Sequence, residues 1–220
     1  MNIRVAKFFS FIGHPMLVLF YMLLLLMAVN PFAFGIRSMA DPKAMVLIIS
    51  VFAITILIPG IGVAIMKPLG LIKSLQMPDR QDRTGPYIVG GVFYLWLVKN
   101  LMSLGSTPPL FVKFAVGTTV CLFLAFFINI FIKVSVHGSG MGGLVTMVLC
   151  TIFAWPDAVL VISALGGTVV INLFVILVAV VILAGLVGVS RLALGAHSPV
   201  ELALGYLLGC ASALIGQVLV

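Results

Sequence analysis

The sequence predicts an all-α protein, a polytopic transmembrane helix bundle with six to seven spans. Of the 220 residues, 63% are hydrophobic and only 8% are charged, whereas a soluble domain carries roughly 25% charged residues. The mean hydropathy is +1.36, and the apolar residues fall in several long stretches. Because no water-soluble fold could hide this much apolar surface, we expect the chain to lie in a bilayer.

The expected spans are stretches of about 20 mostly apolar residues, the length at which a helix crosses the hydrocarbon core. Pro59 and Gly60 mark an expected kink in the second stretch, and Lys99 near the end of the third can reach the interface. The first stretch is too long for a signal-peptide core, so we expect it to be a retained helix. The seven stretches are Phe8–Val29, Ala44–Met66, Pro86–Leu104, Pro109–Ile132, Ser139–Trp155, Thr168–Val189 and Pro199–Val220.

One apolar segment, Pro156–Gly167, is too short to cross a bilayer as a helix. We expect it to form an interfacial helix or to extend the sixth span. The cysteines Cys121, Cys150 and Cys210 lie inside apolar stretches without metal-type spacing and are expected to be packing residues. Residues 1–220 are therefore expected to form a single integral-membrane domain.

The polar residues gather in three connecting segments, Lys67–Gly85, Lys133–Gly138 and Arg191–Ser198. Two expected spans separate the first segment from the second, and two more separate the second from the third. An even number of crossings returns the chain to the same face, so loops on one membrane face should form one site. The net charge of +7 favours contact with membrane lipids and phosphates; no basic run with interleaved aromatics points to nucleic acid.

The third segment lies within Ser190–Glu201, which reads SRLALGAHSPVE. An ionisable residue between lipid-embedded helices is costly and is therefore a functional candidate. In this stretch a His follows Ser-Arg after five residues, and an acidic residue follows the His after three more. This spacing resembles the third signature of the type-2 phosphatidic acid phosphatase superfamily. The resemblance implies that Arg191 binds phosphate and that His197 attacks phosphorus, giving a phosphohistidine intermediate.

Glu201 has two candidate roles. It lies one helical turn beyond His197 and can reach a ring nitrogen of that residue, which would fix the tautomer. The run from Ser198 to Glu201 is also a capping box with Pro199 at the first helical position. We expect both roles to hold only if the carboxylate divides its two oxygens between them.

The first segment contains Lys73 and Arg80, whose separation by six residues resembles the first signature of the same superfamily. Arg83 is a second candidate phosphate ligand. A guanidinium donates two parallel hydrogen bonds to phosphate oxygens, whereas a lysine acts as a point charge, so either arginine suits the role. The alternative is a basic loop in which Asp79 and Asp82 pair with the arginines.

The second segment begins the run KVSVHGSGMGG, in which Ser135 to His137 resembles the second signature of the superfamily. Four glycines follow within six residues at the expected start of a helix. Exposed N–H groups there, with the positive end of the helix dipole, would form an anion site that includes Ser135 and Gly138. His137 would protonate a leaving alkoxide. The alternative is an interfacial histidine beside glycines that allow close helix packing.

These segments supply cations for a phosphate, an acid for the leaving group and a nucleophile with an orienting carboxylate. The resemblance implies a metal-independent membrane phosphatase that acts on a lipid phosphate or diphosphate. Phosphatidic acid, phosphatidylglycerol phosphate, undecaprenyl diphosphate and lipid A phosphate are the candidate substrates. It also implies a bacterial inner membrane with the site at the outer, periplasmic face; the distribution of basic residues does not decide the orientation.

No cofactor and no metal are expected. A zinc site needs three or four ligands, and His197 with Glu201 supplies two. The remaining histidines are His137 and His14, of which His14 is expected to be an interfacial or helix-buried residue ahead of Pro15.

The alternative function is a non-catalytic lipid-binding or transport membrane protein with a degenerate phosphatase site. An enzyme that uses two histidines should show a bell-shaped pH profile, whereas a binder should lose phosphate affinity as its histidines lose their charge. The alternative rests on departures from the signatures at Gln81, Val134, Val136 and Glu201.

Overall fold

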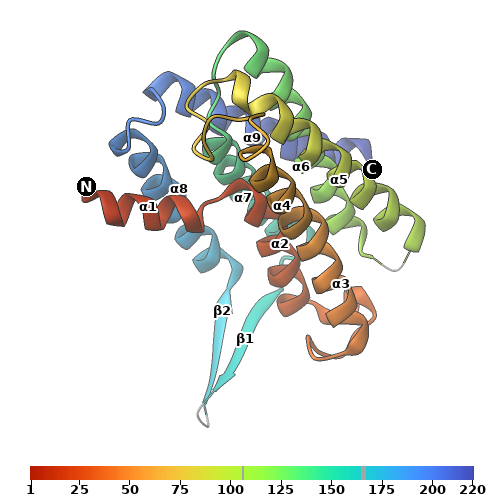
Figure 1. Cartoon of the computed structure of the whole chain (residues 1–220). Helices are drawn as coiled ribbons and strands as arrows, with labels where there is room; N and C mark the ends of the chain where they lie inside the picture. Colours follow the sequence, from red (N-terminus) through yellow and green to blue (C-terminus); the bar gives the residue numbers. More distant parts are fainter. Residues whose placement is uncertain (106, 165–166) are drawn as a thin grey trace.

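The computed structural model describes residues 1–105, 107–164 and 167–220, which form a bundle of α-helices with a small β-hairpin (Figure 1). Within this described part, five helices are long and apolar enough to cross a membrane. The predicted transmembrane helix bundle is therefore confirmed. The five are Pro42–Met66, which contains α3 and α4, then α6 (Pro109–Phe131), α7 (Val136–Ala154), α8 (Leu173–Ala193) and α9 (Pro199–Leu219).

The first predicted span is two helices, so the prediction of one continuous helix is wrong. α1 (Ile3–Ile12) and α2 (Pro15–Val29) meet at an angle of 55°. Gly13 ends α1, and His14 caps α2 by accepting the backbone N–H of Met16 at 3.4 Å. Pro15 has no N–H to continue the ladder of α1 and suits the first position of α2.

The second predicted span contains α3 (Pro42–Phe52) and α4 (Ile58–Met66), joined by the π-helical turn η2 (Ala53–Leu57). The π-turn lies just before Pro59 and Gly60, where a kink was predicted, and Pro42–Met66 is one candidate span of 25 residues. A proline ring crowds the carbonyl four residues earlier, here that of Thr55, and a π-turn gives that carbonyl more room. A short 3₁₀ turn, η1 (Pro31–Phe34), follows α2.

The third predicted span is α5 (Thr84–Leu104), preceded by the 3₁₀ turn η3 (Gln81–Arg83). α5 has 21 residues, but it is not among the five helices apolar enough to cross a membrane. Lys99 and Asn100, together with its glycines, lower its hydropathy. The described chain thus has five candidate spans, or six if α1 and α2 cross together, rather than seven.

The segment after α7 forms a β-hairpin, so the prediction of an interfacial helix or an extended sixth span is wrong. β1 (Val159–Ala164) pairs antiparallel with β2 (Gly167–Asn172), and α8 starts only at Leu173. β-Branched residues dominate both strands and favour extended backbone. The hairpin projects from the bundle at the bottom of Figure 1.

α7 is the central helix and packs against α2, α8 and α9. Its contact with α9 is close because glycines face backbone on the other helix. A Cβ at Gly209 would overlap the carbonyl oxygen of Ser139, and one at Gly142 would overlap that of Tyr206. This contact brings the starts of α7 and α9 together, where the backbone N–H of Ser135 donates to the Glu201 carbonyl at 3.2 Å.

Candidate active site

A cavity of about 410 Å³ lies where α5, α7 and α9 begin and α8 ends. Its wall includes Arg83 from the first polar segment, His137 from the start of α7, and Arg191 and His197 from the third segment. His14, at the break between α1 and α2, also lines it. The structure thus brings residues of the three polar regions to one end of the bundle, as the even number of crossings predicted.

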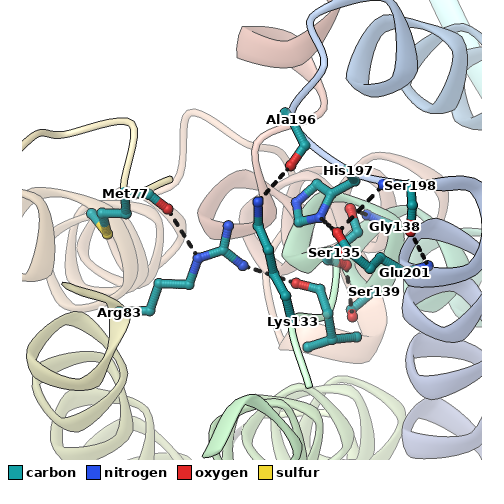
Figure 2. Close-up of polar contacts among 11 residues, drawn as sticks. Met77, Arg83, Lys133, Ser135, Gly138, Ser139, Ala196, His197, Ser198 and Glu201 are labelled. Carbon is teal, nitrogen blue, oxygen red and sulfur yellow. Dashed lines mark hydrogen bonds and ion pairs between the residues drawn. The ribbon is translucent and has the colours of Figure 1, made fainter. Parts of the chain in front are cut away.

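His197 lies in the loop before α9 and is 7% exposed. Its Nδ1 is 2.8 Å from Oε2 of Glu201 (Figure 2). A carboxylate only accepts, so Nδ1 carries the proton of the neutral ring and Nε2 carries the lone pair. Within the described part of the chain, Nε2 is buried and has no hydrogen-bond partner. His197 therefore brings an unprotonated, uncommitted nitrogen to the cavity.

Burial lowers the pKa of His197 from 6.5 to about 4, because the charged ring would lose its hydration. The hydrogen bond to Glu201 acts in the opposite direction and raises this pKa. The positive charges of Arg83, Lys133 and Arg191 lower it further. The ring is therefore neutral at pH 7, the form with a nucleophilic lone pair.

Glu201 serves both of its candidate roles through one oxygen. Oε2 accepts from Nδ1 of His197 at 2.8 Å and from the backbone N–H of Ser198 at 3.4 Å. The Glu201 N–H donates in return to Oγ of Ser198 at 3.3 Å, which completes the capping box of α9. The expectation that the two roles need separate oxygens is wrong, because the two donors belong to adjacent residues and converge on Oε2.

Of the two candidate arginines in the first segment, Arg83 lines the cavity. It is 8% exposed and donates from Nη1 to the Val134 carbonyl at 3.0 Å and from Nε to the Met77 carbonyl at 3.2 Å (Figure 2). Arg80 is exposed and donates to the Ile130 carbonyl at 2.9 Å, at the C-terminal end of α6. Position therefore favours Arg83 as the phosphate ligand.

Lys73 lies at the surface, with Nζ 2.7 Å from Oδ2 of Asp79 and a side chain that is 75% exposed. Asp82 accepts the backbone N–H of Lys73 at 3.2 Å. The two carboxylates thus bind Lys73. The alternative interpretation of this segment, in which Asp79 and Asp82 pair with the arginines, is wrong. The two residues that carry the first signature spacing, Lys73 and Arg80, are not on the cavity wall.

Lys133 lies beside the site without lining the cavity, and the signature spacings did not single it out. Its Nζ donates to the carbonyl oxygen of Ala196 at 2.9 Å, directly before His197. Figure 2 shows its ammonium group between the Arg83 guanidinium and the His197 ring. The signal in the sequence was its position at the head of the second polar segment.

His137 is held by the N-terminal helix. Its Nε2 lies 3.2 Å from the carbonyl oxygen of Ser10 in α1. A carbonyl only accepts, so Nε2 carries the proton and Nδ1 is the nitrogen free to gain or lose one. Nη1 of Arg191 donates to Oγ of the same serine at 3.5 Å. Nothing in the local sequence around Ser10 indicated this role, because the contact joins residues 127 positions apart.

Ser135 and Gly138 are engaged in capping and packing. Ser135 is the N-cap of α7, and its Oγ accepts the Gly138 N–H at 3.2 Å. A Cβ at Gly138 would press on the carbonyl oxygen of Leu202 in α9. Neither residue lines the cavity, so the positions of Ser135 and Gly138 match the packing alternative more closely than a phosphate site.

Among the described residues, no group of three or more His, Cys, Asp or Glu side chains is arranged to hold a metal ion. The protonatable and cationic groups on the cavity wall are mainly histidine and arginine nitrogens, with the Lys133 ammonium beside His197. This donor set suits an anion such as phosphate.

No family model, curated protein or solved structure matches this chain. The structure defines the chain as a transmembrane helix bundle with a cavity that carries histidine and arginine side chains at one end. A fold class of this kind does not specify an activity, so the function has to be argued from the site itself.

Proposed function

We propose that this protein is a metal-independent membrane phosphatase that hydrolyses a lipid phosphate or diphosphate through a phosphohistidine at His197. The observation that carries the proposal is the state of His197. Its Nδ1 is hydrogen-bonded to Glu201, and its buried Nε2 has no partner among the described residues. Arg83 and Arg191 share the same cavity and can neutralise a bound phosphate.

The chemistry proceeds in two displacements. Nε2 of His197 attacks phosphorus, the N–P bond forms, and the P–O bond to the lipid breaks. The negative charge of the bound phosphate favours a second proton on His137, at Nδ1, and His137 gives that proton to the leaving oxygen. Water then attacks the phosphohistidine, loses its proton to His137 Nδ1, and releases inorganic phosphate with both histidines restored.

A lipid substrate is supported by the depth and lining of the cavity. The wall runs from Arg83, directly before α5, along α5 to Tyr94, and along α7 from His137 to Met147. Ten or eleven residues of helix span about 15 Å, so the cavity continues from the charged groups well into the bundle. A headgroup at the charged end would leave room for an apolar chain behind it.

The alternative is a non-catalytic lipid-binding or transport protein that holds a phosphate headgroup without cleaving it. It is favoured by the surface positions of Lys73 and Arg80, the two residues of the first signature spacing. Under this alternative, the lipid would bind, and no phosphate would be released.

The test is the release of inorganic phosphate by detergent-purified protein from a panel of lipid phosphates and diphosphates in EDTA. His197→Ala is the test variant, and Lys43→Ala, which changes an exposed cation at the start of α3, is the control. Release by the parent and by Lys43→Ala, but not by His197→Ala, is the expected result. Binding without release would favour the alternative, and release only after metal addition would refute metal independence.

A further inference from the structure

The nitrogen groups at and beside the cavity fall into two neighbouring sets. The first set lies next to the nucleophile His197 and consists of Arg83, which lines the cavity, and Lys133, which donates to the Ala196 carbonyl directly before His197. The second set gathers at Ser10 of α1. There His137 contacts the serine carbonyl and Arg191 contacts its hydroxyl.

His14 belongs to the second set. Its ring packs edge to face on that of His137, with centroids 5.4 Å apart and planes at 84°. Its Nδ1 accepts the Met16 N–H, so the neutral ring carries its proton on Nε2. Nε2 is the remaining polar atom of a side chain that lines the cavity. His14 thus offers a hydrogen-bond donor to whatever occupies this part of the site.

Each set contains a buried nitrogen that has no hydrogen-bond partner in the described part of the chain. The unpartnered nitrogen beside the first set is Nε2 of His197. The second set has two unpartnered nitrogens, Nδ1 of His137 and Nε of Arg191. A buried polar atom without a partner is costly and points to a ligand that supplies one. Of these atoms, the Nε–H of Arg191 is a donor that suits an anion, and a phosphate beside it would also favour a proton on Nδ1 of His137.

We propose that His14 and Arg191 of the second set bind the inner phosphate of a lipid diphosphate, and that His14 determines the preference for diphosphate over monophosphate. This inference rests on the proposed phosphatase function and names its substrate class. The outer phosphate lies at His197, beside Arg83 and Lys133. The inner phosphate lies toward α1, where Arg191 and the His14 Nε2–H donate to its oxygens.

The cleaved bond is then the one between the outer phosphorus and the bridging oxygen. His197 takes the outer phosphoryl group, and the lipid monophosphate leaves with the bridging oxygen and the electron pair of that bond. Arg191 and His14 stabilise the negative charge that develops on this leaving group. Water then hydrolyses the phosphohistidine, so one water is consumed and one inorganic phosphate is formed per diphosphate.

The experiment compares kcat/KM for an isoprenyl diphosphate and the monophosphate of the same chain, in the full-length protein and in two variants of His14. His14→Asn keeps an N-cap for α2, since asparagine is a favoured cap, but loses the ring. His14→Phe keeps the ring packed on His137 but loses the cap. Both variants lose the Nε2–H donor.

The parent is expected to prefer the diphosphate, and the preference should fall about tenfold in both variants, the value of one hydrogen bond to a charged group. An equal loss on both substrates, a loss in one variant only, or a parent with no preference would overturn the role of His14 while leaving the phosphatase intact. A parent inactive on both substrates would overturn the proposed phosphatase, and this inference with it.

Discussion

Replacing Glu201 with glutamine tests the central contact of the site. Glu201 receives two hydrogen bonds on Oε2, the shorter one from His197 and the longer one from the Ser198 backbone. Glutamine retains one carbonyl oxygen and the capping-box geometry but removes the negative charge. The change therefore separates the support of His197 from the capping of α9.

The expected magnitude follows from the contact that changes. A hydrogen bond to a charged group contributes about 1.5–3 kcal/mol, whereas one between neutral groups contributes about 0.5–1.5 kcal/mol. The difference of roughly 1–1.5 kcal/mol corresponds to a fall in kcat of about tenfold for Glu201→Gln. The midpoint of unfolding should change little, because glutamine also suits the third position of the helix.

The assay is phosphate release in detergent, with thermal unfolding of the same samples. The matched control is Ser198→Ala, which removes the capping hydroxyl of α9 but leaves the carboxylate beside His197. It should lower stability by about 1 kcal/mol with kcat largely retained. If Glu201→Gln keeps full kcat and loses stability instead, Glu201 is a cap only and the reasoning is refuted.

The pH dependence of stability should contain a contribution from His197. Its folded-state pKa of about 4 lies below the ordinary 6.5, so between these values the unfolded chain binds a proton that the folded protein does not. Stability should fall by up to about 3 kcal/mol from pH 6.5 to pH 4, and His197→Ala should flatten this part of the unfolding curve. A slope unchanged in the variant would show that another group causes it. Arg83→Ala should raise KM for the lipid phosphate about tenfold or more, and Arg80→Ala should raise it much less; equal effects would contradict the assignment of Arg83. Gly209→Ala should destabilise the protein by about 3 kcal/mol or more, because its methyl group would overlap the backbone of α7. Gly185→Ala on α8, where a Cβ meets nothing within 4 Å, is the control and should be neutral or stabilising by up to about 1 kcal/mol in thermal unfolding. Equal stability of the two glycine variants would exclude close α7–α9 packing.

Much of the fold could be predicted from hydropathy alone, because a bilayer requires long apolar helices whose backbone groups are all satisfied within the helix. The errors lie where local backbone chemistry competes with that rule. Gly13 and Pro15 divide the first apolar stretch into α1 and α2. The apolar residues after Ala154 satisfy their backbone groups by pairing β1 with β2, which a helix-length criterion could not anticipate.

The sequence by itself determined that the three polar regions share one end of the bundle, because two helix-length stretches separate each polar region from the next. It also offered the contact between His197 and Glu201 as one of two candidate roles of Glu201, since the two residues are four positions apart at a helix start. Only the tertiary structure showed that Arg83 lines the cavity and Arg80 does not, because the two arginines, three residues apart, donate to different backbone carbonyls. It alone brought His14 to the cavity, because the packing of α7 against α2 is a long-range contact that no local pattern encodes.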